Sequence, residues 1–174
     1  TTIPVVLFPG NAFQLTNKAD ALLLLSLISG RNAEWLIGQH VQAAKAIQQS
    51  ALETISTGYI LIDGGNTTAV ERVSKTKPLQ RDAIDEVVST ALAGQLLGHK
   101  LIYLEAGSGA QNPVPTALIK AVKKAIDIPL IVGGGLTSTD AIKQAYEAGA
   151  DIVVVGNYLE THLEKMVDFC AVRN

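Results

Sequence analysis

The sequence predicts an α/β protein built as a (βα)8 barrel of the TIM type. Two observations predict this fold. Six short runs along the chain are almost continuously apolar, which is typical of parallel strands covered on both faces. Polar and glycine-rich residues follow the carboxyl end of almost every run. In a barrel all of these strand ends meet at one rim, whereas an open sheet gathers its ligand site near a single switch point.

The elements are expected in the following order. The strands are predicted at residues 3–8, 21–27, 57–62, 100–105, 129–134 and 151–156. Residues 115–126 form a helical pattern with Leu118 and Val122 on one side and lysines on the other. Residues 138–151 form another, because they begin with Ser and Thr, carry an acid in the first turn and end near Gly149.

The strand count is short of a closed barrel. A barrel of this type has eight strands and about 250 residues, and this chain has 174 residues. An open arc would expose two apolar parallel edges, which favours aggregation. We therefore expect that the first two βα units are missing from this chain; the alternative is that a partner chain closes the sheet. The composition does not shift along the chain, so residues 1–174 are expected to form a single, incomplete, phosphate-binding barrel domain.

Charge and composition narrow the class of protein. The formal net charge is −2, which gives no electrostatic reason to expect nucleic-acid binding. Cys170 is the lone cysteine, so a disulfide framework and a Cys-rich zinc site are excluded and a reducing compartment fits best. The longest apolar run, 21–29, is far below the ~20 residues of a membrane span, and no signal peptide is visible. A cytoplasmic location is the expectation.

The last two strands end in sequences suited to phosphate. "LIVGGGLTS" (130–138) and "VVVGN" (153–157) are consecutive strand ends, where barrels commonly hold phosphate by backbone N–H groups and a helix N-terminus. Glycine lets the main chain approach an anion closely. Each charge-assisted hydrogen bond to phosphate contributes about 1.5–3 kcal/mol, so four or five preorganised donors are enough for useful phosphate affinity without an arginine. The alternative is that these glycines serve only tight turns.

The strand at 100–105 ends in side chains that a buried strand does not need. Glu105 is the acidic residue of that glycine-rich strand end, and Tyr103 points to the same side because strand side chains alternate. A carboxylate there can take the proton of a substrate hydroxyl, and the phenol can orient it. The alternative is that Glu105 pairs with a lysine at the barrel mouth.

Several segments together resemble the geranylgeranylglyceryl phosphate synthase family, including its bacterial heptaprenylglyceryl phosphate synthase relatives. The most specific are "YLEAGSGA" (103–110), "VGGG" (132–135) and "VVGN" (154–157). The others are "IPVVLFPGNAFQLTNKADALLLLSLISGRN" (3–32), "GYILIDGG" (58–65) and "TALAGQLLG" (90–98). The resemblance implies transfer of a long prenyl group, with geranylgeranyl diphosphate as the expected donor, to the sn-3 hydroxyl of sn-glycerol 1-phosphate. The product is an ether bond in ether-lipid biosynthesis.

The resemblance also implies roles for individual residues. Tyr103 and Glu105 match the pair that contacts glycerol, with Glu105 as the catalytic base. The matching phosphate donors are Ser108, Gly109, Gly134, Gly135, Gly156 and Asn157. Mg²⁺ is implied as the cofactor that holds the diphosphate, bound by an aspartate on the first strand of the family, which this chain lacks. A homo-oligomer, dimer or hexamer, is implied as well.

The prenyl chain needs a groove outside the barrel interior, which side chains fill. Residues 20–40 could supply it, with Trp35 as a wall or a length stop; simple packing of Trp35 is the alternative. The polar segment 66–83 is long enough for a mobile lid whose Lys75, Lys77 and Arg81 could meet the diphosphate. Asp63 is either a substrate contact or a turn residue.

Other readings of the sequence remain. The scattered histidines His40, His99 and His162 share no ligand spacing and are expected to be surface or capping residues. One alternative function is another phosphate-binding barrel enzyme, an isomerase or an aldolase. The predicted strands carry no candidate Schiff-base lysine except Lys100, at the wrong end of its strand for catalysis. Another is a truncated barrel that binds glycerol phosphate without catalysis.

Overall fold

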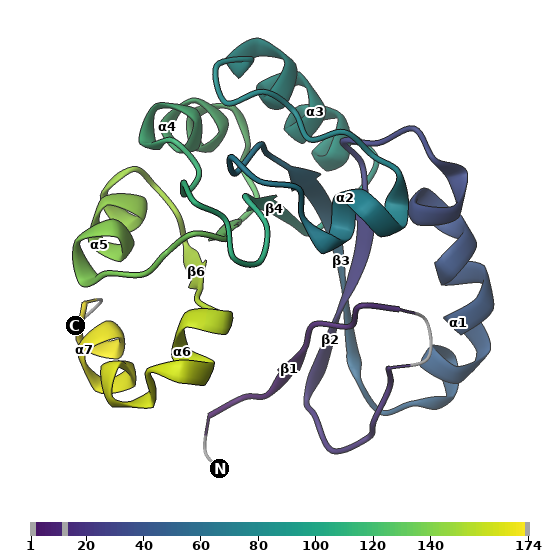
Figure 1. The fold of residues 1–174 in the computed structure, drawn as a ribbon. Helices are drawn as coiled ribbons and strands as arrows, with labels where there is room; N and C mark the ends of the chain where they lie inside the picture. The colour runs from purple at the N-terminus through teal and green to yellow at the C-terminus, as the bar shows by residue number, and fades with distance from the viewer. Residues whose placement is uncertain (1–2, 12–13, 173–174) are drawn as a thin grey trace.

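The computed structural model describes residues 3–11 and 14–172. Within them the chain forms one parallel sheet whose strands follow the sequence order. The sheet curls into an arc (Figure 1). Its strands are β1 (Val6–Leu7), β2 (Ala21–Leu27), β3 (Glu53–Leu61), β4 (Leu101–Glu105), β5 (Leu130–Gly133) and β6 (Ile152–Val154). Because consecutive strands are neighbours throughout, this is the topology of a barrel and not of a doubly wound sheet, in which the order reverses.

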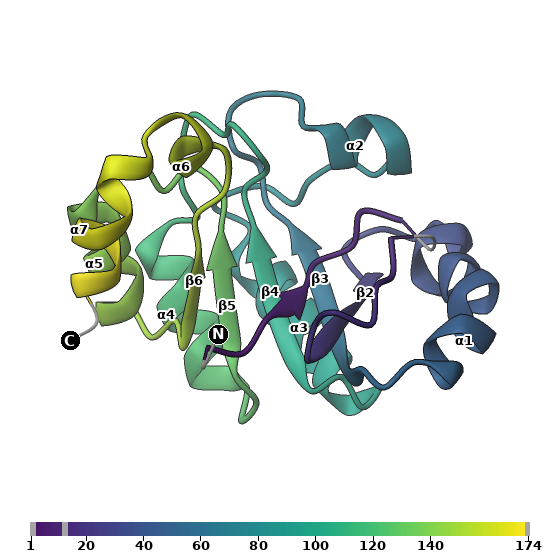
Figure 2. The same cartoon turned by 90° about the horizontal axis from the view of Figure 1, so that it is seen from below.

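The helices lie on the outer side of the arc and at one of its rims. They are the π-helical turn η1 (Glu34–Gly38), α1 (Gln39–Gln49), α2 (Ala69–Ser74), α3 (Ile84–Leu96), α4 (Thr116–Ala125), α5 (Thr139–Glu147), α6 (Asn157–Thr161), the 3₁₀ turn η2 (Leu163–Lys165) and α7 (Met166–Ala171). Both helices expected from periodicity are present. α5 is capped by Ser138, whose hydroxyl accepts a hydrogen bond from the N–H of Ala141 at 3.2 Å. Figure 2 shows α2 and α6 at the rim to which the strands point.

Two apolar layers explain why the strands read as continuous hydrophobic runs. Alternate residues of β4 face opposite sides: Ile102 and Leu104 join the core under the outer helices, whereas Leu101 and Tyr103 join the core on the inner side of the arc. Both layers are buried, so neither face of the strand is polar. Glu105 follows the same alternation and therefore ends the strand on the inner side.

The strand boundaries differ most from the predicted ones in β1, β3 and β6. β1 is only two residues long, because the chain leaves the sheet after pairing Leu7 with Leu22. β3 begins at Glu53, earlier than residue 57, since Glu53 and Thr54 pair with β2 although they are exposed and polar. β6 ends at Val154. None of the helices among the described residues has the length and apolar character that a membrane span requires.

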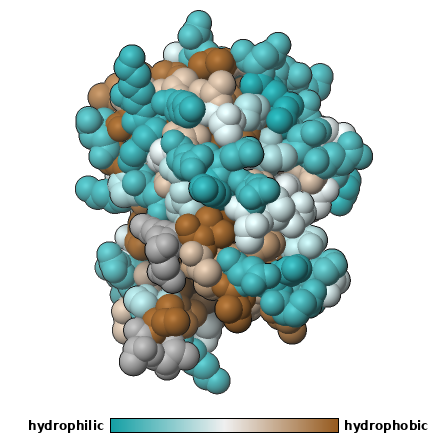
Figure 3. Space-filling view, turned by 90° about the vertical axis from the view of Figure 1, so that its left-hand side faces the viewer, coloured by the Kyte–Doolittle hydropathy of each residue, from teal (hydrophilic) through white to brown (hydrophobic). Residues whose placement is uncertain are grey.

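The expectation that an open arc exposes apolar edges is confirmed for the described residues. β1 and β6 are the edge strands. Val6 on β1 is 45% exposed and Ile152 on β6 is 41% exposed, which is high for aliphatic strand residues. Figure 3 shows hydrophobic side chains gathered on the lower part of the face at the left of Figure 1. The sheet is thus a partial barrel whose carboxyl rim is intact from β2 to β6.

Candidate active site

A cavity of about 530 Å³ lies at the carboxyl ends of the strands. Every residue predicted to bind glycerol phosphate lines it, from the ends of β4, β5 and β6. These residues are Tyr103, Glu105, Ser108, Gly109, Gly134, Gly135, Gly156 and Asn157. The cavity also has lining residues that the sequence did not single out, among them Tyr59, Val70 and Thr137. The predicted convergence of strand ends is therefore what the structure has, and we call this space the polar cavity.

Glu105 is a buried carboxylate at the wall of the polar cavity. Glu105 is only 7% exposed to solvent. Its Oε1 accepts a hydrogen bond from the N–H of Gly107 at 2.6 Å. The phenol of Tyr103 donates a second hydrogen bond to the carboxylate. Burial raises the pKa of Glu105, and the two hydrogen bonds partly oppose that rise. None of the ion pairs among the described residues includes Glu105, so no lysine of this part of the chain neutralises it.

An aromatic cluster borders the carboxylate. The ring centroids of Tyr59 and Tyr103 are 5.3 Å apart, and that of Phe8 lies 5.5 Å from Tyr103. Burial, and then the negative charge of Glu105, raise the pKa of both tyrosines. Both phenols are therefore neutral hydrogen-bond donors at physiological pH. In the sequence Tyr59 has the pattern of an ordinary core residue of a strand, so nothing distinguishes it from its neighbours.

Three of the four predicted phosphate-binding glycines are required by the backbone. Gly134 has φ +84°, and a Cβ there would lie 2.5 Å from Oε1 of Glu105 and 2.6 Å from the N of Gly107. Gly135 and Gly109 also have positive φ, +70° and +72°. A Cβ at Gly156 would meet nothing within 4 Å, so this main chain faces open space. A tight turn accounts for Gly109, and a tight turn together with close approach accounts for Gly134 and Gly135, but neither explains Gly156.

The loops after β4 and β6 are joined directly. The hydroxyl of Ser108 donates a hydrogen bond to Oδ1 of Asn157. No lysine or arginine is among the described residues that line the polar cavity, and Glu105 is their one charged member. An anion bound here would be held by neutral N–H and O–H donors.

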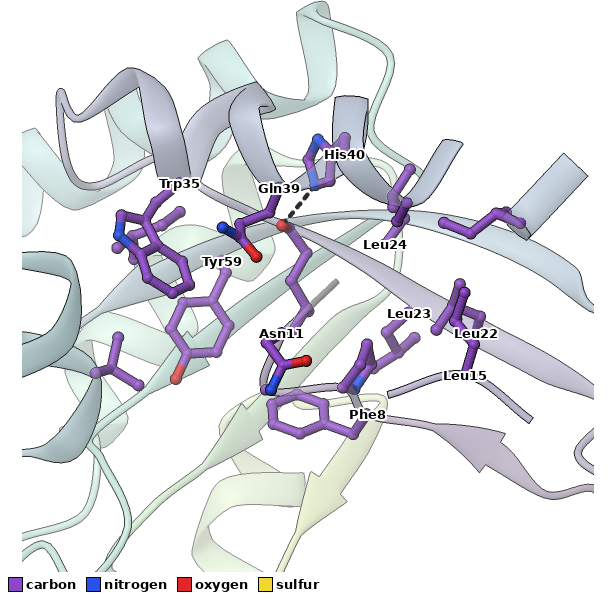
Figure 4. Close-up of a pocket in the computed structure, with 17 residues that line it drawn as sticks. Phe8, Asn11, Leu15, Leu22, Leu23, Leu24, Trp35, Gln39, His40 and Tyr59 are labelled. Atoms are coloured by element: carbon purple, nitrogen blue, oxygen red, sulfur yellow. Dashed lines mark hydrogen bonds between the residues drawn. The ribbon is translucent and has the colours of Figure 1, made fainter. Parts of the chain in front are cut away.

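A second cavity, of about 150 Å³, adjoins the first and is mostly apolar. It lies between the segment after β1, strand β2 and the helices η1 and α1, and we call it the apolar cavity. Figure 4 shows Trp35 and Tyr59 on one side of it and Leu22, Leu23 and Leu24 of β2 on the other. Phe8, Tyr59 and Val70 line both cavities, which therefore meet at these three residues. Trp35, the predicted wall of a prenyl groove, lines this cavity.

Three further expectations from the sequence are resolved. His40 is half-buried, lines the apolar cavity, and has its Nε2 2.8 Å from the carbonyl of Leu25. Asp63 is a turn residue, since its Oδ1 accepts from the N–H of Gly65 at 2.9 Å. The guanidinium of Arg81 donates to the carbonyls of Asp63 and Asn112, at 3.1 and 3.5 Å, and braces two loops.

The two other histidines fit the expected role better. His99 is half-buried, with its Nδ1 2.8 Å from the hydroxyl of Ser56, and burial lowers its pKa. His162 Nδ1 lies 3.0 Å from the carbonyl of Tyr158 at the end of α6. No group of three or more His, Cys, Asp or Glu side chains positioned to hold a metal ion occurs within 3–11 and 14–172.

The fold and the site define a protein of the βα-barrel class, with a ligand cavity at the carboxyl ends of its strands. The chain belongs to the PcrB family, whose model matches residues 1–173. It is 57% identical to a geranylgeranylglyceryl phosphate synthase of Zunongwangia profunda over 92% of this chain and 68% of that one, and 42% identical to the synthase of Pyrococcus furiosus over 92% and 63%. The resemblance drawn from the sequence is confirmed.

Solved structures agree. A crystal structure of the (S)-3-O-geranylgeranylglyceryl phosphate synthase of Thermoplasma acidophilum, in complex with its substrate sn-glycerol-1-phosphate, superposes with a TM-score of 0.88 at 36% identity over 99% of this chain and 68% of that one. The wild-type enzyme of Thermoplasma volcanium gives 0.87 at 35% identity, with the same coverage. The chain thus spans about two thirds of the length of the relatives it matches.

Proposed function

We propose that this chain carries the acceptor site and the catalytic base of a prenyltransferase that joins a prenyl diphosphate to the sn-3 hydroxyl of sn-glycerol 1-phosphate. The observation that carries the proposal is the buried carboxylate of Glu105 between a glycine-lined polar cavity and an apolar one. The related synthase of Thermoplasma acidophilum holds sn-glycerol-1-phosphate as its substrate. The product would be an ether-lipid precursor, and geranylgeranyl diphosphate would be the prenyl donor.

The acceptor phosphate would lie against the strand ends at Gly134, Gly135 and Gly156. Their main-chain N–H groups and the Nδ2 of Asn157 supply neutral donors that can hold a phosphate. The hydroxyl of Ser108 would turn from Oδ1 of Asn157 to the bound phosphate. This placement turns the glycerol hydroxyls toward Glu105. Proximity of this kind removes most of the entropy cost of bringing the hydroxyl to its base.

Glu105 would act as the general base. The bond between C1 of the donor and its diphosphate breaks, the sn-3 oxygen forms a bond to C1, and the hydroxyl proton moves to the carboxylate of Glu105. The raised pKa of Glu105 makes it a stronger base than an ordinary glutamate. The hydrogen bonds from Tyr103 and from the N–H of Gly107 fix the carboxylate in place.

The apolar cavity would receive the part of the prenyl chain that lies next to the reacting carbon, C1. A cavity of about 150 Å³ is the size that holds a benzene ring, close to one isoprene unit, so the remainder of a long donor would extend beyond it. Each buried CH₂ contributes about 0.8 kcal/mol to donor binding. Trp35, in the wall of this cavity, is the proposed contact for the prenyl chain.

Mg²⁺ as the ion of the donor's diphosphate, a homo-oligomeric state and a cytoplasmic location belong to the same proposal. They rest on the family resemblance. An aldolase is disfavoured because the described residues that line the polar cavity include no lysine for a Schiff base.

The test is a transfer assay with radiolabelled sn-glycerol 1-phosphate, geranylgeranyl diphosphate and Mg²⁺. A lipid-soluble radioactive product is expected. Glu105→Gln should keep the Kd for glycerol phosphate within a few-fold and sharply lower turnover, whereas Glu164→Gln, on an exposed carboxylate of η2, should change neither. Unchanged turnover in Glu105→Gln would remove Glu105 as the base. Binding without any product from the unaltered protein would instead support the non-catalytic alternative.

A further inference from the structure

The short helix α2 is held between the two cavities by contacts at both of its ends. At its start the hydroxyl of Thr68 accepts from the N–H of Glu71 at 3.1 Å, and the methyl of Thr68 packs closely against Gly107. Before it, Nδ2 of Asn66 donates to the carbonyl of Gly109 at 3.3 Å. These contacts fix the start of α2 to the loop after β4, which lines the polar cavity.

The other end of α2 is fixed to the loop after β2. Nδ2 of Asn32 donates to the carbonyl of Ser74 at 3.0 Å, and Ser74 is buried. Asn32 lies just before η1, which supplies Trp35 to the apolar cavity. The helix is therefore anchored to the loops that build both cavities, and its inner side spans the place where they meet.

Val70 is the residue through which α2 faces that junction. Its side chain lines both cavities and packs against the inner core that contains Tyr59 and Tyr103. It has no group that can hydrogen-bond water. Val73, on the same helix, is 64% exposed and lines neither cavity. Val73 is therefore a matched control for Val70, because it is the same residue type on the same helix but lies outside both cavities.

The chemistry at this junction makes an apolar wall useful. If the proposed function holds, the bond between C1 and the diphosphate weakens here and positive charge develops on C1. A water molecule beside C1 would compete with the glycerol hydroxyl. Its oxygen would bond to C1, its proton would pass to the released diphosphate, and the donor would be lost as a free prenyl alcohol.

We propose that Val70 keeps water away from C1 and thereby determines whether the prenyl group passes to glycerol phosphate or to water. Val70→Ala removes two methyl groups, which leaves room for about one water of some 30 Å³. Val70→Thr keeps the shape and places a hydroxyl at the junction that can bind such a water. Val70→Ile keeps the wall apolar and leaves no room for a water molecule.

The test follows both products of radiolabelled geranylgeranyl diphosphate, with saturating sn-glycerol 1-phosphate and Mg²⁺. The ratio of prenyl alcohol to ether should rise several-fold in Val70→Ala and Val70→Thr, and stay at the level of the unaltered protein in Val70→Ile and in the matched control Val73→Ala. Because the ratio compares products of the same molecules, a loss of folded protein does not change it.

The failures are distinguishable. If the unaltered protein consumes no donor, the proposed function itself is wrong. If it forms the ether and Val70→Ala and Val70→Thr form it with the same small share of alcohol, then the role of Val70 is rejected while the proposed function stands.

Discussion

Replacing Gly134 by alanine tests the geometry that brings the loops after β4 and β5 together. At φ +84° an alanine costs about 1–2 kcal/mol in backbone strain. Its Cβ would also lie 2.5 Å from Oε1 of Glu105, 2.6 Å from the N of Gly107 and 2.9 Å from the N of Ala106. Overpacking of this kind costs about 1–3 kcal/mol. We expect Gly134→Ala to lower the free energy of unfolding by roughly 2–5 kcal/mol.

Gly109→Ala is the matched control, because it carries the strain without the clash. Gly109 has φ +72°, lines the same cavity, and a Cβ there would meet nothing within 4 Å. Its expected cost is about 1–2 kcal/mol. The difference of about 1–3 kcal/mol corresponds to roughly 2–12 °C in Tm for a chain of this size.

Urea unfolding and thermal melts of both variants measure these values, and titration with sn-glycerol 1-phosphate measures the consequence for the site. Gly134→Ala pushes against two atoms of the hydrogen bond that holds Glu105, so it should also weaken acceptor binding more than Gly109→Ala does. Equal losses of stability in the two variants would refute the close approach between Gly134 and the end of β4.

Two other predictions concern charge. Burial raises the pKa of Glu105 in the folded protein above its value in the unfolded chain, so the native state binds the proton more tightly. The protonated carboxyl of Glu105 therefore contributes to the free energy of unfolding at low pH. This contribution is lost as the pH rises through the folded-state pKa. Denaturation at a series of pH values should show this decline, and Glu105→Gln should remove it; an identical pH dependence in the variant would contradict the assignment. EDTA should stop transfer, and added Mg²⁺ should restore it. Binding of glycerol phosphate should not respond, because its proposed partners are main-chain N–H groups and neutral side chains that need no metal ion; transfer that continues in EDTA would exclude the Mg²⁺ requirement.

The sequence predicted the sheet well wherever strands are apolar on both faces. β2 was predicted to the residue, since every position from Ala21 to Leu27 except Ser26 is hydrophobic. The early part of β3 was missed, because Glu53 and Thr54 join the sheet through backbone pairing alone, which hydropathy does not report. β1 was predicted too long for the converse reason: Ile3 and Val5 are apolar but lie outside the paired region.

Part of the candidate site could be predicted from the sequence and part could not. Its glycines and Glu105 could be predicted, because such residues are costly at a strand end unless something needs them. Tyr59 and Val70 could not, since an aromatic or aliphatic residue facing a cavity has the same pattern as one facing a core. The place of His40 beside the apolar cavity could not be predicted either, because its partner is the main-chain carbonyl of Leu25 on β2, and a main-chain partner leaves no mark in residue spacing.

The proposed reaction gives a reason for holding phosphate with glycines instead of arginines. A guanidinium within about 4–6 Å of a carboxylate lowers its pKa by 1–3 units, which would weaken Glu105 as a base. Neutral N–H and O–H donors hold the phosphate without that effect, and the lining of the polar cavity offers only such donors among its described residues. The bound phosphate, itself negative, would raise the pKa of Glu105 further. The base would therefore be strongest when its acceptor is in place, which couples acceptor binding to proton removal without any movement of the protein.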